Sequence, residues 1–189
     1  MNLATLPNIL TVARIVAVPL VVALFYWSHP WSNPLAAIVF IAAAITDSLD
    51  GYLARRLGLT TPLGEFLDPV ADKLMVSTAL VLLVGHDTRP LIVITAVIII
   101  GREITVSALR EWMAHLGARA KVAVSGMGKV KTIVQMTGLS MMMFRSDVFG
   151  LPVYEIGVLL LVVAGALTLW SMASYLQAAW PELRRDPRP

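Results

Sequence analysis

Long apolar stretches separated by short polar connections make up most of the chain. Six of them can be read, at about residues 11–27, 34–45, 67–84, 91–109, 133–144 and 153–175. A helix needs about 20 mostly apolar residues to cross a bilayer, and four of these stretches approach that length. The second stretch is short, but its helical pattern continues past Asp47 and Asp50 towards Arg56. The pattern therefore predicts an all-α membrane protein with six transmembrane helices.

The composition supports this interpretation. Hydrophobic residues make up 58% of the chain and charged residues only 14%, and the mean hydropathy is +0.78. A protein of 20.5 kDa buries too little surface to hide so many apolar side chains from water, which excludes a soluble globular enzyme. We expect one membrane-embedded domain over residues 1–180 and a polar tail over 181–189.

The residue types also limit the metal chemistry. Cysteine is absent, and the three histidines lie far apart in the sequence. Disulfides are therefore excluded and a zinc site is disfavoured, because zinc prefers thiolate and imidazole ligands. A bound metal would take oxygen ligands, as magnesium, manganese and calcium do.

The basic residues predict the orientation of the helices. Only Arg89 and Arg145, of the 15 lysines and arginines, fall in the connections after the first, third and fifth stretches. The other basic residues lie on the opposite side, which the positive-inside rule assigns to the cytoplasm. We therefore expect both termini on the cytoplasmic side.

Four aspartates form two pairs at helical spacing. Asp47 and Asp50 lie at the inner end of the second stretch, and Asp68 and Asp72 at the inner start of the third. Members of each pair share one helix face. A short connection at 57–65 would make the two helices antiparallel neighbours, so that four carboxylates face one another. Repulsion between carboxylates this close favours a bound divalent cation.

Other interpretations of these residues remain open. An Asp pair at this spacing is often a solvated helix face, and Asp68 before Pro69 is typical of a helix N-cap. The four carboxylates could also line a proton or cation pathway. The small residues Gly51, Ala54 and Gly64 permit either close helix packing or the approach of a flat ligand such as a nucleotide.

These residues together carry a resemblance to a known family. From Asp47 to Asp72 the chain matches the pattern D-x2-D-G-x2-A-R-x8-G-x3-D-x3-D at all eight fixed positions, and is thereby identified as a member of the CDP-alcohol phosphatidyltransferase family. Residues 7–14 resemble the N-terminal P-N-x-L-T-x-x-R element of the same family. The segments 102–111 and 128–136 resemble a bacterial branch that uses sn-glycerol 3-phosphate.

The resemblance implies a fold, a reaction and a location. Family members are six-helical, membrane-embedded and usually homodimeric, and move a phosphatidyl group from CDP-diacylglycerol to an alcohol with release of CMP. We expect glycerol 3-phosphate as the acceptor, membrane lipids but no nucleic acid as partners, and an active site on the cytoplasmic side of a bacterial inner membrane. Inositol phosphate, serine, choline or phosphatidylglycerol remain alternative acceptors. A small cation transporter is the alternative of another class.

The resemblance also implies residue roles. Two divalent cations, Mg²⁺ or Mn²⁺, would be held by Asp47, Asp50, Asp68 and Asp72, with Asp72 as general base, as metal ligand, or as both. The positions matching nucleotide contacts are Thr11, Arg14, Gly51, Ala54, Arg55 and Gly64. Spacing alone would make Arg55 a simple membrane anchor.

The acceptor phosphate calls for cations at the inner ends of the fourth and fifth stretches. Arg110, Lys129 and Lys131 are the candidates. Lys129 and Lys131 diverge by about 160° on one helix, so both face one ligand only if the helix begins after Lys129.

Two further expectations concern packing. The adjacent charges of Arg102 and Glu103 inside a stretch predict pairing with other helices. The methionines at 141–143 are expected to face lipid.

Overall fold

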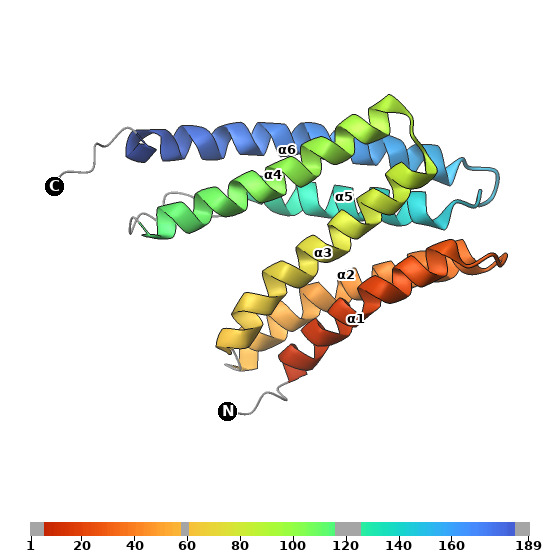
Figure 1. The fold of residues 1–189 in the computed structure, drawn as a ribbon, viewed down its shortest axis with the longest axis horizontal. Helices are drawn as coiled ribbons and strands as arrows, with labels where there is room; N and C mark the ends of the chain where they lie inside the picture. The colour runs from red at the N-terminus through yellow and green to blue at the C-terminus, as the bar shows by residue number, and fades with distance from the viewer. Residues whose placement is uncertain (1–5, 58–60, 116–125, 184–189) are drawn as a thin grey trace.

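The structure is a computed structural model that describes residues 6–57, 61–115 and 126–183 (Figure 1). Within these ranges the chain forms six helices: α1 (Leu6–Tyr26), α2 (Ser32–Leu57), α3 (Pro62–His86), α4 (Pro90–His115), α5 (Gly126–Phe144) and α6 (Val153–Leu183). Each contains one of the six apolar stretches, so the all-α prediction is confirmed.

Three helix ends differ from the sequence-based expectation. Thr61 is the N-cap of α3 and Pro62 its first residue, so Asp68 and Pro69 lie inside this helix and Asp68 is not a cap. Helix α5 begins at Gly126, which places Lys129 within it. The condition stated for the convergence of Lys129 and Lys131, a helix that begins after Lys129, is therefore not met. Helix α6 extends through Pro181 to Leu183, beyond the expected start of the polar tail.

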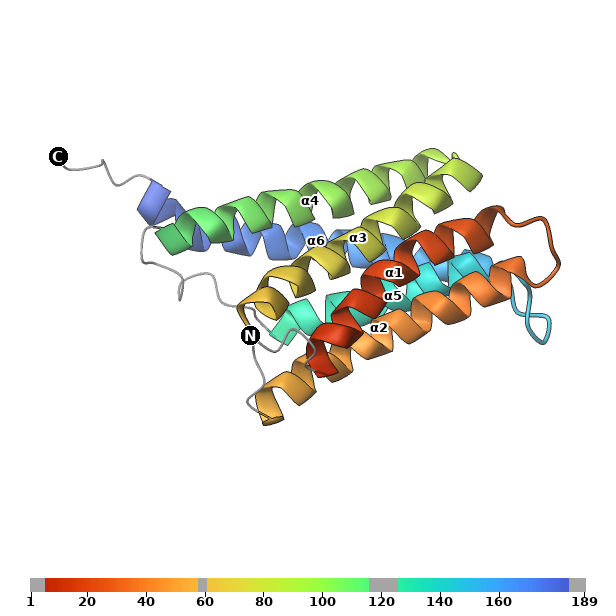
Figure 2. The ribbon, with the colours of Figure 1, turned by 60° about the horizontal axis from the view of Figure 1, so that its bottom comes forward.

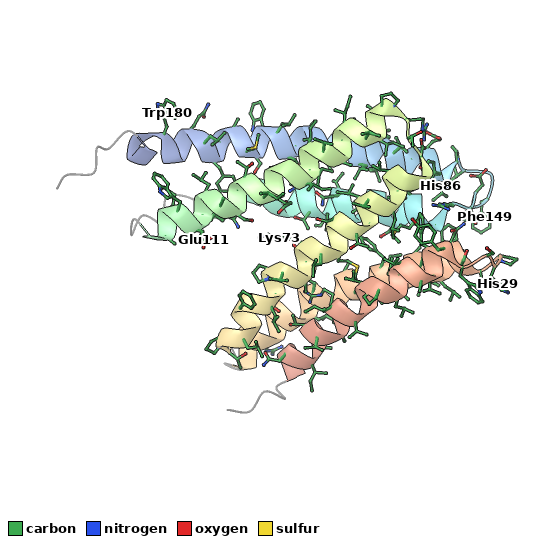
Figure 3. The ribbon with its side chains drawn as sticks, in the orientation of Figure 1. His29, Lys73, His86, Glu111, Phe149 and Trp180 are labelled. Carbon is green, nitrogen blue, oxygen red and sulfur yellow. The ribbon has the colours of Figure 1, made fainter. Side chains whose placement is uncertain are left out.

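The helices form a bundle with two distinct ends. The connections α1–α2, α3–α4 and α5–α6 lie together at one end, and the start of α1 and the end of α6 lie towards the other (Figures 1 and 2). His29, His86 and Phe149 mark the first end in Figure 3, whereas Glu111 and Trp180 lie towards the second. Helix α3 runs between the α1–α2 pair and the α4–α6 group, and contacts helices of both.

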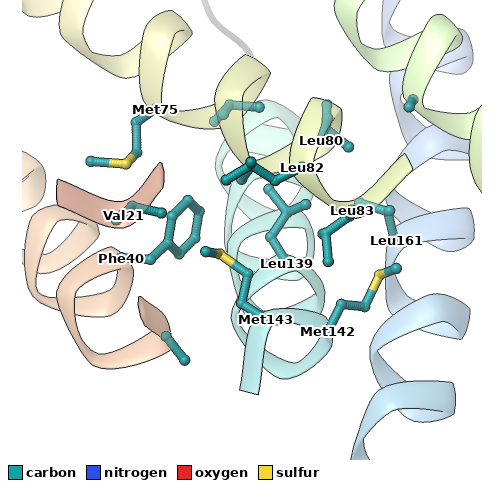
Figure 4. Close-up of a cluster of buried hydrophobic side chains, with 14 of the residues drawn as sticks. Val21, Phe40, Met75, Leu80, Leu82, Leu83, Leu139, Met142, Met143 and Leu161 are labelled. Carbon is teal, nitrogen blue, oxygen red and sulfur yellow. The ribbon is translucent and has the colours of Figure 1, made fainter. Parts of the chain in front are cut away.

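The hydrophobic core lies where α3 crosses α5. Phe40 from α2, Leu83 from α3, and Leu139, Met142 and Met143 from α5 are fully buried there (Figure 4). The expectation that the methionines at 141–143 face lipid is therefore wrong for Met142 and Met143. Unbranched methionine side chains fill irregular gaps between helices, which suits this crossing.

The outer surface of the bundle is apolar. Three segments are long and apolar enough to cross a membrane, namely Asn8–Tyr26, Pro90–Ala114 and Val153–Gln177, and Ser32–Asp47 is a shorter apolar helix; this count covers only the described part of the chain. Exposed large apolar residues also occur on α2, α3 and α5, for example Ile38, Val81 and Ile133. Such a surface is typical of a protein surrounded by lipid.

A polar cluster fixes the end where the connections lie. Asp87, the C-cap of α3, accepts hydrogen bonds from the side chains of Arg89 and Tyr154, and Arg89 also pairs with Glu155 at 3.0 Å. Burial raises the pKa of Asp87, but the hydrogen bonds from Arg89 and Tyr154 outweigh it and hold the pKa below its usual value. The cluster ties the α3–α4 connection to the start of α6.

Glycines allow α5 and α6 to pack closely. A Cβ on Gly157 would lie 2.8 Å from Cγ of Met142 and 2.9 Å from the carbonyl oxygen of Gly138. These distances are below van der Waals contact, so the two backbones meet only because position 157 has no side chain.

We therefore expect Gly157→Ala to destabilise the protein by about 1–3 kcal/mol, the usual effect of overpacking. The measurement is thermal unfolding of purified protein in detergent. Gly101→Ala is the matched control, because a Cβ at this helical position would meet nothing within 4 Å. Equal melting temperatures for the two variants would contradict the close contact.

Candidate active site

One face of α1 is polar and buried. Asn8, Thr11 and Arg14 recur every three residues, and each is 3% exposed or less. The opposite face carries exposed apolar residues such as Val12 and Val16. Polar groups buried in an apolar bundle need partners, and those of α1 lie on α2 and α3.

The N-terminus of α3 is held against α1. The Thr61 hydroxyl accepts a hydrogen bond from the backbone N–H of Gly64 at 3.0 Å and donates one to Oδ1 of Asn8 at 2.8 Å. A Cβ on Gly64 would lie 2.9 Å from the same Asn8 oxygen. Gly64 thus makes room for α1, and its contact with a nucleotide stays a prediction.

The polar face of α1 contacts two of the four predicted carboxylates. Arg14 forms an ion pair with Asp47 on α2. The hydroxyl of Thr11 donates a hydrogen bond to Oδ1 of Asp68 on α3 at 2.6 Å. Asp47 also interacts electrostatically with Asp68 and with Asp72, one turn further along α3. The structure thus brings Asp47, Asp68 and Asp72 into one region, with Thr11 and Arg14 beside them.

Five predicted site residues lie outside the described side chains. Their backbones belong to α2 and α5, and they are Asp50, Gly51, Ala54, Arg55 and Lys129. Among the side chains that are described, no three His, Cys, Asp or Glu residues are grouped closely enough to hold a metal ion. The donor set is nevertheless of one kind, carboxylate oxygen, and suits a hard cation such as Mg²⁺ or Mn²⁺.

A buried polar network joins α4, α5 and α6. Oε1 of Glu103 accepts hydrogen bonds from Arg102 and from Nζ of Lys131, both at 2.9 Å, and Arg102 also donates to Oγ of Ser171 at 3.2 Å. The predicted pairing of Arg102 and Glu103 with other helices is confirmed. Lys131 is 4% exposed, so Glu103 balances a charge that would otherwise be costly to bury.

Arg110 lies about two turns beyond Arg102 on α4. Its guanidinium donates a hydrogen bond to the hydroxyl of Tyr175 at 3.0 Å and lies 5.3 Å from the centre of the Tyr175 ring. Arg110 is not among the residues lining the pocket at Asp72. Tyr175 therefore holds Arg110 at a separate position nearer the end with the termini.

A polar pocket connects the two groups of charges. Asp72 and Lys73 on α3, Glu103 on α4, and Lys131 and Gln135 on α5 line it. A carboxylate and an ammonium thus face the same small space, which has a volume of about 30 Å³, from different helices. Such a pair can attract an anionic group at one end of a molecule and remove a proton at the other.

A larger apolar groove runs beside this pocket. It has a volume of about 600 Å³ and lies between α2 and α5, with Ile45, Ile133 and Met141 among its lining residues. Asp47 lies in the same lining. The groove therefore joins an apolar surface to the carboxylates.

Sequence analysis missed four contributors to these sites: Asn8, Glu103, Gln135 and Tyr175. Asn8 had a detectable signal, because it shares the three-residue spacing of Thr11 and Arg14. Gln135 lies four residues after Lys131 and hence on the same helix face. Glu103 was assigned to packing alone, and nothing in the sequence connects Tyr175 to Arg110.

Comparisons with known proteins place these residues in a wider context. The sequence profile described as CDP-alcohol phosphatidyltransferase matches residues 4–170. A curated Pseudomonas fluorescens protein named CDP-diacylglycerol–glycerol-3-phosphate 3-phosphatidyltransferase is 50% identical over 184 residues, covering 97% of this chain and 94% of the relative. Proteins of the same name from Shigella flexneri serotype 5b and Escherichia coli K12 are each 47% identical over 178 residues, covering 94% of this chain and 96% of the relative.

The contact between Thr11 and Asp68 makes a stability prediction. Thr11→Val keeps the side-chain shape but removes the hydroxyl that donates to the carboxylate. We expect a loss of about 1–2 kcal/mol, as for other hydrogen bonds to charged groups, and recovery in Thr11→Ser.

Thermal unfolding in detergent tests this expectation. Thr105→Val is the matched control, because the Thr105 hydroxyl donates only within its own helix, to the carbonyl of Gly101 at 2.8 Å. A Thr11→Val protein as stable as Thr105→Val would show that the hydrogen bond to Asp68 contributes nothing.

Proposed function

The chain belongs to the CDP-alcohol phosphatidyltransferase family, and we propose that it transfers the phosphatidyl group of CDP-diacylglycerol to sn-glycerol 3-phosphate. The products are phosphatidylglycerophosphate and CMP. The names of relatives that match 94% or more of the chain support this reaction. It belongs to phospholipid biosynthesis.

The observation that carries the proposal is the shared pocket of Asp72 and Lys131. The acceptor has a hydroxyl at one end and a phosphate at the other. Asp72 accepts the proton of the acceptor hydroxyl. The hydroxyl oxygen then forms a bond to the lipid phosphorus, and the bond between this phosphorus and the CMP oxygen breaks. Lys131 attracts the acceptor phosphate with its ammonium. Arg110, held by Tyr175 outside this pocket, and Lys129, near the start of α5, add positive charge at the inner end of the bundle.

The predicted metal site fits the chemistry of the donor set. Asp47, Asp50, Asp68 and Asp72 would hold two divalent cations, Mg²⁺ or Mn²⁺. Bound cations would neutralise the pyrophosphate of the donor and stabilise the departing CMP. The mutual repulsion of Asp47, Asp68 and Asp72 supports this assignment, because Arg14 compensates only part of their charge.

The nucleotide is assigned to the region where the C-terminal part of α2 lies near the starts of α1 and α3. Gly51, Ala54 and Arg55 on α2 match the family pattern, and Arg55 can bind phosphate with a bidentate fork. Thr11, Arg14 and Gly64 take part by fixing the carboxylates and the start of α3.

The apolar groove between α2 and α5 would take the acyl chains of the donor. Its position beside Asp47 supports this assignment, because the diphosphate and the acyl chains belong to one molecule. All six helices would cross the bacterial inner membrane, with the active site and both termini on the cytoplasmic side. Exposed apolar residues on every helix support the crossing, and the basic residues at the inner end support the orientation. We further propose a homodimer, the usual state of the family.

The direct test measures CMP release by purified protein from CDP-diacylglycerol with a panel of alcohols. We expect rapid release with glycerol 3-phosphate and Mg²⁺ or Mn²⁺, at least about tenfold slower release with serine, inositol phosphate or phosphatidylglycerol, and none in excess EDTA. Equal use of another acceptor would refute the assigned substrate, and full turnover in chelator would refute the metal site. A cation transporter would release no CMP.

Asparagine variants separate the proposed base from the metal ligands. Asp72→Asn keeps the shape but removes the proton acceptor, so we expect kcat to fall about 10²–10⁴-fold with little change in the metal midpoint. Asp47→Asn should instead raise the metal concentration needed for half-maximal turnover. A metal titration of turnover checks both variants. If Asp72→Asn shifts the midpoint as far as Asp47→Asn does, Asp72 is a metal ligand first.

A further inference from the structure

Gln135 has a buried amide with an unsatisfied atom. The residue is 4% exposed, and its Oε1 atom has no hydrogen-bond partner among the described groups. A buried carbonyl without a partner is costly, so a side chain in this state indicates a missing ligand or water.

The unsatisfied amide lines the pocket that contains Asp72 and Lys131. Gln135 follows Lys131 by one helical turn on α5, and both line this pocket. The neighbouring groups of α4 and α5 are charged, and Lys131 and Arg102 both donate hydrogen bonds to Glu103. The amide of Gln135 therefore offers the pocket a neutral partner.

The acceptor has one polar group that the proposed function leaves unassigned. In glycerol 3-phosphate the C1 hydroxyl would face Asp72 and the phosphate would face Lys131. The C2 hydroxyl lies between them along the carbon chain and needs a partner once it is removed from water. Because a hydroxyl both donates and accepts, it can pair with either atom of an amide.

We propose that the side-chain amide of Gln135 hydrogen-bonds the C2 hydroxyl of glycerol 3-phosphate and thereby selects this acceptor. The inference rests on the proposed function and adds a specificity-determining residue to it. Sites that hydrogen-bond a substrate hydroxyl discriminate strongly against analogues that lack it, because the buried partner is then left unpaired.

The test compares two acceptors. Propane-1,3-diol monophosphate has the primary hydroxyl and the phosphate of glycerol 3-phosphate but no C2 hydroxyl. With wild-type protein we expect kcat/KM to be about 10–100-fold lower for this analogue. Equal use of the two acceptors by the wild type would overturn the proposal without any variant.

Gln135→Met removes the amide at nearly constant size. We expect kcat/KM for glycerol 3-phosphate to fall about 10–100-fold while that for the analogue hardly changes, so that the preference disappears. The KM for CDP-diacylglycerol should stay constant. Gln177→Met, the same change at an exposed position on α6, is the matched control and should keep the wild-type preference.

A merely structural role gives a different result. If Gln135 only supports the fold, both acceptors lose activity in parallel and the preference is unchanged, which overturns the proposal. Should Gln135→Met fail to fold, the wild-type comparison of the two acceptors still decides. Absence of CMP release with every acceptor would instead refute the proposed function itself.

Discussion

Burial of Arg14 in an apolar bundle is the constraint on which the candidate site depends. The guanidinium is almost fully enclosed and pairs with Asp47, so α1 and α2 can pack only in a register that brings these two groups together. Breaking a buried ion pair on one side is strongly unfavourable, which makes the register robust. Thr11 lies one turn earlier on the same face of α1, and its hydroxyl donates a hydrogen bond to Asp68, which holds α3 in place against α1. The carboxylates are positioned by a helix that contributes none of them.

Helix α3 transmits this placement to the other half of the molecule. Its start is capped by Thr61 and held against Asn8, and its C-terminal part packs through Leu80 and Leu83 into the core with α5. Asp72 lies between these two fixed regions, so it faces the pocket from a rigid element. A catalytic group needs such support, because small misplacements are costly for reactivity.

Hydrophobic patterning predicted the six helices because each must present an apolar surface. It could not show which face of a helix packs in the core and which faces lipid when the helix is apolar all round. Met142 and Met143 were therefore assigned to lipid although they fill the core. The pairing of Arg102 with Glu103 was predictable from the cost of isolated charges, whereas the contact between Arg110 and Tyr175 joins residues 65 positions apart and left no local signal. The eight-position motif located Asp68 and Asp72. Thr61 before Pro62 and Asp68 before Pro69 carry the same local N-cap signal, and the helix begins at the first of them, where Thr61 also contacts Asn8.

The distribution of charge across the pocket gives the site a direction. The described side chains near the pocket carry opposite net charges on its two sides. The α1–α3 side has a net charge of −1, from Asp47, Asp68 and Asp72 against Arg14 and Lys73. The α4–α5 side has a net charge of +1, from Arg102 and Lys131 against Glu103. Electrostatic interactions are stronger away from bulk water, so the net positive charge on the α4–α5 side attracts an anionic group. A molecule with a phosphate at one end is therefore drawn to the α4–α5 side by that end, and under the proposed function its hydroxyl would face Asp72. Glu103 is essential to this charge distribution. It permits Lys131 to be buried, while Arg102 keeps the net charge of the three residues positive.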